Sequence, residues 1–198
     1  MAMELDLLHR FSDDDIEELS RRNPELFFER TSEGRLLVSP PAGWIGGSRE
    51  ALLVAQLLSW NQRAGGGGCA FGPSAGFTLA DRALLAPDAS WISAEKFALL
   101  RILQPEDKFA PICPDVAFEV VSESDRPIVI RRKIETYIRN GALCAVLIDP
   151  DERIVEMSRP GALHIALADP HRLTIPLDLL PGATEPLEID LDQLFGSP

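Results

Sequence analysis

The chain has 198 residues, of which 45% are hydrophobic and 25% charged, and its formal net charge is −12. These proportions are those of an ordinary globular protein that is long enough to bury a core. The acidic balance counts against general affinity for nucleic acids, which depends on lysine and arginine at phosphates. A local basic site stays open, because five basic residues fall in one short stretch that is either a solvated helix face or such a site: Arg126, Arg131, Arg132, Lys133 and Arg139.

Cysteine, histidine and hydropathy set further limits. The three cysteines are widely spaced without a C-x-x-C pair, and the three histidines lack zinc-site spacing, so reduced, buried thiols are expected. No stretch reaches the roughly 18 apolar residues that span a bilayer. The first residues lack a basic segment followed by an apolar one, which is not typical of a secretory signal. We therefore expect a cytoplasmic protein without a membrane segment.

The first 45 residues predict a helix and a β-hairpin. Ser12 precedes an acidic first turn and has the features of an N-cap, and the helix should end near Asn23. Residues 26–30 and 35–38 flank the turn sequence Ser32-Glu33-Gly34, so they are expected to pair.

The middle of the chain alternates helices and strands. Ser48 is expected to cap a helix whose apolar residues at 51–60 face every direction, which predicts burial on nearly all sides. The elements expected after it are a bent strand or strand pair at 69–71 and 76–79, the strands with Asp88 and Glu119, a short helix at 94–101 between them, a helix at 124–140, a strand at 145–148, a hairpin of 153–158 with 163–167, and a tail ending at 187–195.

The core order is thus helix, strand, strand, strand, helix, strand, with a hairpin before it and another after it. This order indicates an α/β (mixed α+β) fold around one central mixed sheet. We expect a single domain over residues 1–198. Residues 1–45 would form the N-terminal helix and hairpin, 46–150 the core, and 151–198 the C-terminal hairpin and tail.

Two carboxylates stand in apolar, strand-like sequence. Asp88 follows Leu85-Ala86-Pro87, and Glu119 lies within Val116-Ala117-Phe118-Glu119-Val120-Val121. An ionised carboxylate is costly to bury without compensation, so two of them on neighbouring strands indicate a shared hard cation such as Mg²⁺. On the helix at 124–140, Lys133 shares the core-facing stripe and could fold back over the strands. Such a set is typical of a metal-dependent phosphodiesterase site.

Each of these residues also has a plainer interpretation. Glu119 could pair with an arginine, and Lys133 could extend its ammonium to water while its stem covers apolar surface. Glu50, in the first turn of the helix capped by Ser48, could be a favourable charge at the helix N-terminus or a third acidic group facing the metal. Asp115, which also follows a proline, is expected at the strand entrance and outside the site.

A serine hydrolase is a remote alternative. Gly72-Pro73-Ser74-Ala75-Gly76 matches G-x-S-x-G, with Ser74 as nucleophile, and Asp149 and His164 or His171 follow in the right order. That motif requires a strand, a sharp turn and then a helix, whereas Phe77-Thr78-Leu79 is typical of a strand. A glycine-rich bend is the preferred interpretation.

Taken together, these segments resemble the Uma-type family of restriction-endonuclease-like proteins in the PD-(D/E)XK nuclease superfamily. The similarity runs through most of the chain, and the order and spacing of its segments are fairly specific. The segments are Arg22-Asn23-Pro24-Glu25-Leu26, Val38-Ser39-Pro40, Pro87-Asp88-Ala89-Ser90-Trp91, Cys113–Ser122, Lys133-Ile134-Glu135-Thr136-Tyr137, Asn140-Gly141-Ala142, Leu147-Ile148-Asp149-Pro150 and Leu180-Pro181-Gly182.

The resemblance implies the restriction-endonuclease-like αβββαβ core and a Mg²⁺- or Mn²⁺-dependent endonuclease acting on DNA, with a homodimer as a further implication. Asp88 falls on the "PD" position and Glu119 on the "(D/E)" position. Val121 stands where the superfamily has its lysine, and Lys133 matches a lysine that serves instead on the following helix. The implied metal ligands are Asp88, Glu119 and Val120. A catalytically silent member that acts as a binding or assembly module is the alternative.

Overall fold

The computed structural model describes residues 3–5, 10–103, 108–123, 125–162 and 164–196. Its strands are β1 (Met3–Leu5), β2 (Phe27–Arg30), β3 (Leu36–Ser39), β4 (Cys69–Phe71), β5 (Phe77–Thr78), β6 (Leu84–Leu85), β7 (Ala89–Ile92), β8 (Val116–Val120), β9 (Cys144–Asp149), β10 (Ile154–Ser158), β11 (Ile165–Ala168), β12 (Arg172–Ile175) and β13 (Leu187–Asp190). Its helices are α1 (Asp13–Arg22), α2 (Trp44–Ala64), α3 (Ala94–Leu103), α4 (Pro127–Arg139) and α5 (Asp192–Phe195), with a 3₁₀ turn at Leu177–Leu179.

A six-stranded mixed sheet forms the centre of the molecule, in the order β11-β10-β9-β8-β7-β4. Only β8 and β9 run parallel among its described pairs, and α4 provides the crossover that parallel neighbours require. The series α2, β4, β7, β8, α4, β9 is the αβββαβ order expected from the sequence. The mixed α/β fold is therefore confirmed, with β5, β6 and α3 inserted into it.

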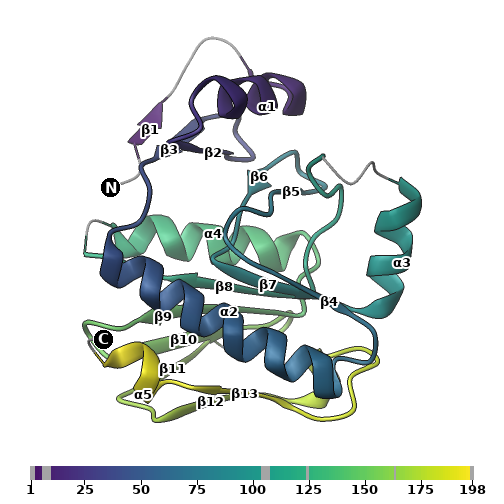
Figure 1. Cartoon of the computed structure of the whole chain (residues 1–198), viewed down its shortest axis with the longest axis vertical. Helices are drawn as coiled ribbons and strands as arrows, with labels where there is room; N and C mark the ends of the chain where they lie inside the picture. The colour runs from purple at the N-terminus through teal and green to yellow at the C-terminus, as the bar shows by residue number, and fades with distance from the viewer. Residues whose placement is uncertain (1–2, 6–9, 104–107, 124, 163, 197–198) are drawn as a thin grey trace.

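Helix α2 covers one face of this sheet (Figure 1). Leu53, Leu57, Trp60 and Ala64, spaced by three or four residues, are its buried apolar side chains, and β12, β13 and α5 pack around the same cluster. The predicted burial on nearly all sides is wrong, since the side chain of Leu58 is 41% exposed. An all-round apolar helix surface does not reveal which side the sheet will cover.

The start of α2 also differs from the prediction. The helix begins at Trp44, with Gly43 as its N-cap, so Ser48 lies inside it and caps nothing. Glu50 consequently lies in the second turn, and no acidic residue lies in the first. The expectation that Glu50 is a charge in the first helical turn is therefore wrong.

Helix α4 covers the opposite face of the six-stranded sheet (Figure 1). Its buried residues are Ile130, Ile134 and Tyr137, which is the stripe expected from a helical period. Gly141, just past its end, has a φ of +99°, a conformation that glycine adopts without strain. The predicted start at Ser124 and the predicted strand start at Leu163 lie outside the described residues.

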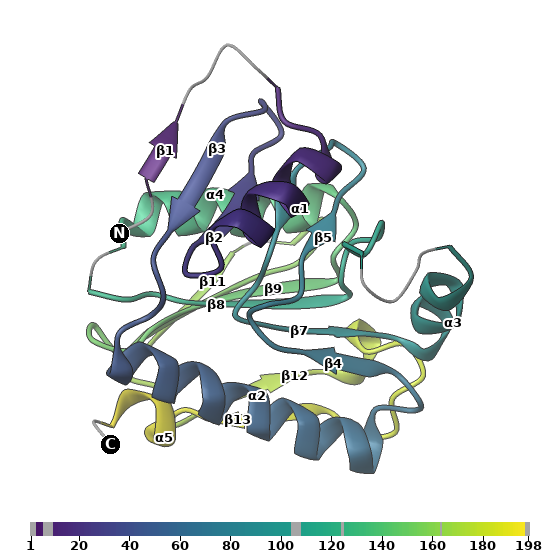
Figure 2. The same ribbon diagram turned by 45° about the horizontal axis from the view of Figure 1, so that its top comes forward.

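A second sheet, in the order β1-β3-β2-β6-β5, stacks over α4 on the side away from α2 (Figures 1 and 2). Strands β2 and β3 form the predicted hairpin. The predicted association of segments 69–71 and 76–79 is wrong, because β4 joins the six-stranded sheet and β5 joins this one. The chain thus crosses between the sheets at residues 72–76, and it returns through β6 to β7, which brings Asp88 to the space between them.

Buried polar contacts hold α1 against the second sheet. The guanidinium of Arg30 donates to the carbonyl oxygens of Arg82 and Phe11, and it pairs with Asp13 at 2.7 Å. Ser12 caps α1 in a capping box with Asp15, as the sequence predicted for Ser12. Throughout the described ranges, no helix is both long enough and apolar enough to cross a membrane.

Candidate active site

Asp88 and Glu119 meet at one end of the β7–β8 ladder. The two strands pair antiparallel, with Ala89 opposite Phe118, and Asp88 lies at the bend just before β7. Because the ladder stops there, the Asp88 carboxylate turns toward β8, and its Oδ2 accepts the Val120 N–H at 2.6 Å. Glu119 lies on β8 of the central sheet as predicted, whereas Asp88 lies one residue before the neighbouring strand β7 and not on it.

The Glu119 carboxylate is almost completely enclosed, with 3% of its side chain exposed. Strand alternation turns it toward the α4 side of the sheet, together with Ala117 and Val121. Lys133 donates from Nζ to Oε2 at 2.9 Å, and the Tyr137 hydroxyl donates to Oε1 at 2.8 Å. Both oxygens therefore have a hydrogen-bond donor, and the donors are one helical turn apart on α4.

We expect Tyr137→Phe to destabilise the protein by about 1–3 kcal/mol, because it leaves a buried carboxylate oxygen without its donor. Tyr137 is completely buried, and burial followed by the nearby carboxylates raises the pKa of its hydroxyl, so it keeps its proton as the donor. Urea unfolding at pH 9 and pH 5 measures the effect. The loss should be larger at pH 9, where Glu119 is ionised; an equal loss at both pH values would contradict this assignment.

Lys133 also binds a second carboxylate that the sequence did not single out. Its Nζ lies 2.9 Å from Oε1 of Glu29, and the same oxygen accepts the Ala86 N–H at 2.8 Å. Glu29 is on β2, within the N-terminal hairpin. In the sequence it is one polar position among the aromatic and charged residues of a short strand, and no local pattern connects it with positions 119 and 133.

Glu50 approaches the same cluster from α2. It is half-buried, and burial, then the negative charges of Glu119 and Asp125, raise its pKa. This influence requires the Glu50 carboxyl group to lie within electrostatic reach of Glu119. Its role as a third acidic group facing the metal stays a prediction.

The surplus of carboxylates has a clear electrostatic consequence. Burial, followed by the charges of Glu50 and Glu29, raises the pKa of Asp88 to about 7 against the opposing effects of Lys133 and the Val120 N–H. Burial also raises the pKa of Glu119, although Lys133 opposes it. Burial alone would lower the pKa of Lys133, but its carboxylate neighbours outweigh it and keep the ammonium charged. One buried cation therefore faces several carboxylates.

The donor chemistry of this cluster suits a hard divalent cation. Asp88 and Glu119 supply carboxylate oxygens, and the Val120 N–H is occupied by Asp88, so Val120 could offer only its backbone carbonyl. Mg²⁺ commonly takes one or two carboxylates and completes its shell with water and phosphate oxygens. Across the part of the chain that the structure describes, no three His, Cys, Asp or Glu side chains are arranged to hold a metal ion. The residues thus fit a site of two carboxylates that depends on water and substrate for its other ligands.

Two groups of candidates lie elsewhere. Asp115, at the opposite end of β8, is buried and pairs with Lys96 at 2.8 Å, so it belongs to a separate ion pair.

Ser74, the candidate nucleophile of the serine-hydrolase alternative, is exposed in the turn between β4 and β5, and no helix directly follows it. His164 contacts Ser158, and His171 contacts Asp192. The structural context required for a serine nucleophile elbow is therefore missing.

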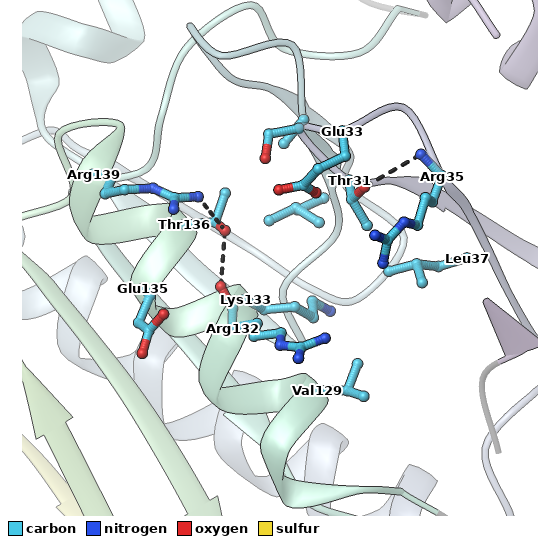
Figure 3. Close-up of a pocket in the computed structure, with 13 residues that line it drawn as sticks. Thr31, Glu33, Arg35, Leu37, Val129, Arg132, Lys133, Glu135, Thr136 and Arg139 are labelled. Carbon is cyan, nitrogen blue, oxygen red and sulfur yellow. Dashed lines mark hydrogen bonds between the residues drawn. The ribbon is translucent and has the colours of Figure 1, made fainter. Parts of the chain in front are cut away.

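A pocket of about 370 Å³ opens between the β2–β3 hairpin and α4, and Lys133 is one of its lining residues (Figure 3). Arg35 extends from the hairpin, and Arg132 from α4, on facing walls. The charged residues of the lining are Arg35, Arg132, Lys133 and Arg139, with Glu33 and Glu135. Cations therefore outnumber acids at this place, in a chain that has 19 basic and 31 acidic residues.

The profile of the Uma2 family, described as "Putative restriction endonuclease", matches residues 13–190. The chain belongs to the Uma2 family. Among solved structures it is similar to a protein from Anabaena variabilis ATCC 29413, described as a putative nuclease belonging to DUF820, with 21% sequence identity and a TM-score of 0.66. The similarity covers 85% of this chain and 89% of that one, and it supports the nuclease-like fold. No curated protein matches the chain.

Proposed function

We propose that this Uma2 protein is a Mg²⁺- or Mn²⁺-dependent nuclease that hydrolyses phosphodiester bonds in DNA. The observation that carries the proposal is the buried Lys133 ammonium, 2.9 Å from the Glu119 carboxylate. Val121 occupies the position at which the superfamily's lysine normally follows the acidic residue. Lys133, from α4, places an ammonium group beside the Glu119 carboxylate instead. The proposed site would therefore contain two acids and a lysine.

The metal would be held by Asp88 and Glu119, with the Val120 carbonyl as a further oxygen. When bound, such an ion stabilises negative charge at the scissile phosphate and lowers the pKa of a coordinated water. The side chains have separate parts in this scheme. The Asp88 and Glu119 carboxylates would bind and orient the ion, and Lys133 would add a fixed positive charge toward the phosphate.

Two further side chains support this arrangement. Tyr137 holds the Glu119 carboxylate in one orientation through its hydroxyl. Glu50 would add a third acidic group near Glu119, and burial raises the pKa of its carboxyl group.

The cationic pocket supports DNA as the substrate. It adjoins Lys133, so a phosphate group bound there would lie beside the proposed site. The guanidinium of Arg132 makes no hydrogen bond or ion pair to any described residue, although its backbone carbonyl accepts from the Thr136 hydroxyl at 2.8 Å. The acidic Glu135 turns away from the hairpin (Figure 3). An unpaired guanidinium in an acidic protein is suited to a phosphate, which it can bind through two parallel hydrogen bonds.

We expect Arg132→Gln to weaken DNA binding about tenfold and to lower the slope of log affinity against log salt by about 1, because one phosphate contact is lost. Binding is measured by fluorescence anisotropy in an Asp88→Asn background, because this substitution prevents cleavage during the measurement. Arg101→Gln, an exposed arginine on α3, removes the same charge away from the pocket. If both arginine variants weaken binding equally, the pocket is not the contact site.

A catalytically silent binding or assembly module is the second candidate. The observation in its favour is that the Lys133 ammonium already pairs with both Glu119 and Glu29 in the absence of a metal. In that case the ion pair would be structural, and DNA or a protein partner would be bound without cleavage.

The test is incubation of purified protein with plasmid DNA and Mg²⁺ or Mn²⁺, with Asp88→Asn as the control. Metal-dependent nicking or linearisation by the wild type and none by the variant would support the nuclease. No cleavage with either metal, together with retained DNA binding, would favour the silent module. Light scattering of the same preparation tests the predicted homodimer.

A further inference from the structure

Glu29 connects the N-terminal hairpin with both halves of the proposed site. Its side chain is 12% exposed, and Oε1 forms an ion pair with Lys133 Nζ at 2.9 Å and accepts a hydrogen bond from the Ala86 N–H at 2.8 Å. Lys133 is the proposed catalytic cation, and Ala86 lies two residues before Asp88. One carboxylate oxygen of β2 therefore contacts the lysine and the segment that carries the metal ligand.

The backbone around Glu29 is held in place from both sides. Strand β2 pairs with β3 on one side and with β6 on the other, through Arg30 opposite Leu84. The next residue after Glu29, Arg30, is buried and anchored to two carbonyl oxygens. Because β6 leads directly to Ala86, the position of β2 determines where that segment begins. Glu29 therefore belongs to a rigid element, as a side chain that orients a site should.

Charge balance gives Glu29 a specific task. Lys133 is the cation shared by Glu119 and Glu29, which lie on strands of different sheets. A divalent ion at Glu119 would repel the ammonium and compete with it for Oε2. Glu29 is not among the proposed metal ligands, so it would still pair with Lys133 when Glu119 coordinates the ion.

We propose that Glu29 is a positioning residue, which keeps the Lys133 ammonium in the site while Glu119 binds metal and which anchors the segment leading to Asp88. This inference rests on the proposed function and adds the N-terminal hairpin to the active site. The hairpin would thus complete the site, and the αβββαβ core alone would lack the lysine's second partner.

The first experiment separates the two contacts of Glu29. Glu29→Gln keeps a carbonyl oxygen that can accept the Ala86 N–H but loses the charge that holds Lys133, whereas Glu29→Ala loses both. We expect Glu29→Gln to lower kcat about tenfold or more, with KM for DNA changed less than twofold, since a misplaced catalytic group costs rate. Exchange of the Ala86 amide should stay slow in Glu29→Gln and become fast in Glu29→Ala.

Glu25→Gln is the matched control, because Glu25 is an exposed acid shortly before β2 and its removal changes the net charge equally. It should leave kcat and the Ala86 exchange rate at the wild-type values. A purely structural role predicts that Glu29→Gln also has the wild-type kcat, and that result would overturn the proposal.

The second experiment does not depend on activity. In metal-free protein, Glu29→Gln should lower the thermal midpoint of the wild type, because Lys133 loses a partner. In a Lys133→Met background the same substitution should raise the midpoint, because it removes an uncompensated buried charge. A shift of the same sign and size in both backgrounds would show that Glu29 does not hold Lys133.

These two experiments distinguish the failure of this inference from failure of the proposed function. A wild type that cleaves no DNA with any divalent metal would overturn the nuclease, and with it the catalytic part of this proposal. The change of sign in the thermal shift would still decide whether Glu29 anchors the lysine.

Discussion

Lys133→Met is expected to lower the rate of metal-dependent DNA cleavage by at least about 100-fold, because it removes the one buried ammonium that the site offers to a phosphate. Methionine keeps the apolar stem that packs along α4. Metal binding should persist or become tighter, since lysine is not a metal ligand and its charge opposes a divalent ion at Glu119. Plasmid cleavage at saturating DNA and calorimetric titration with Mg²⁺ or Mn²⁺ measure the two effects.

The same substitution should also destabilise the metal-free protein by roughly 3 kcal/mol, because Glu119 and Glu29 would be left buried without their cation. Circular dichroism at the assay temperature must therefore show that the variant is folded. Arg101→Met is the control for loss of one exposed positive charge. Full cleavage activity in folded Lys133→Met would remove Lys133 from the catalytic machinery.

Asp88→Asn is expected to reduce cleavage by about 1,000-fold or more and, at the same time, to stabilise the metal-free protein at alkaline pH. The activity is lost because an amide is a poor ligand for a hard cation. The higher stability of the variant at alkaline pH follows from the protonation equilibrium of the wild-type Asp88 carboxyl group. The folded-state pKa of Asp88 is about 7 and its usual value is 3.8, so the folded protein binds a proton that the unfolded chain has released between these values.

The contribution of the Asp88 carboxyl group to stability should consequently be fully present below about pH 4 and should be lost as the pH rises to about 7. Three pKa units correspond to an upper bound of about 4 kcal/mol, and we expect about 2 kcal/mol because Asp88 is only half-buried. Asparagine has no such titration and can still accept the Val120 N–H. The advantage of the variant should thus be near zero at pH 4 and greatest above pH 7.

Urea unfolding at pH 4.5 and pH 8.5 in EDTA measures this difference, and Asp178→Asn is the control at an exposed acid. Addition of Mg²⁺ should stabilise the wild type and not Asp88→Asn, because only the wild type retains the ligand. Equal stabilisation of both proteins by the metal would place the ion elsewhere. A difference in stability that does not vary with pH would show that Asp88 carries no burial penalty.

Much of the site could be predicted from the sequence because its signals are local. Asp88 and Glu119 interrupt apolar runs, and a buried charge in such a run requires compensation. Lys133 lies on the apolar stripe of a helix whose period is visible in the sequence, and that stripe is buried as expected. The contact between Lys133 and Glu119 therefore follows from strand alternation, helical period and the crossover from β8 through α4 to β9.

Other features depend on elements that are distant in the chain. Glu29 is 104 positions from Lys133 and joins it only because the second sheet stacks over α4. Tyr137 has the spacing of a core residue, and its hydroxyl partner becomes clear only when α4 lies over β8. The start of α2 at Trp44 was missed because Gly46 and Gly47 have low helix propensity, which tertiary contacts override.

The sequence by itself determined the order of the core elements, the two strand carboxylates and the lysine on the core face of α4, because apolar periodicity and the cost of buried charge act within a few residues. Only the tertiary structure decided that β4 and β5 separate into different sheets, that α2 buries one face, and that a hairpin carboxylate completes the lysine's ion pairs. These outcomes depend on which surfaces pack together, and that packing is a property of the whole chain.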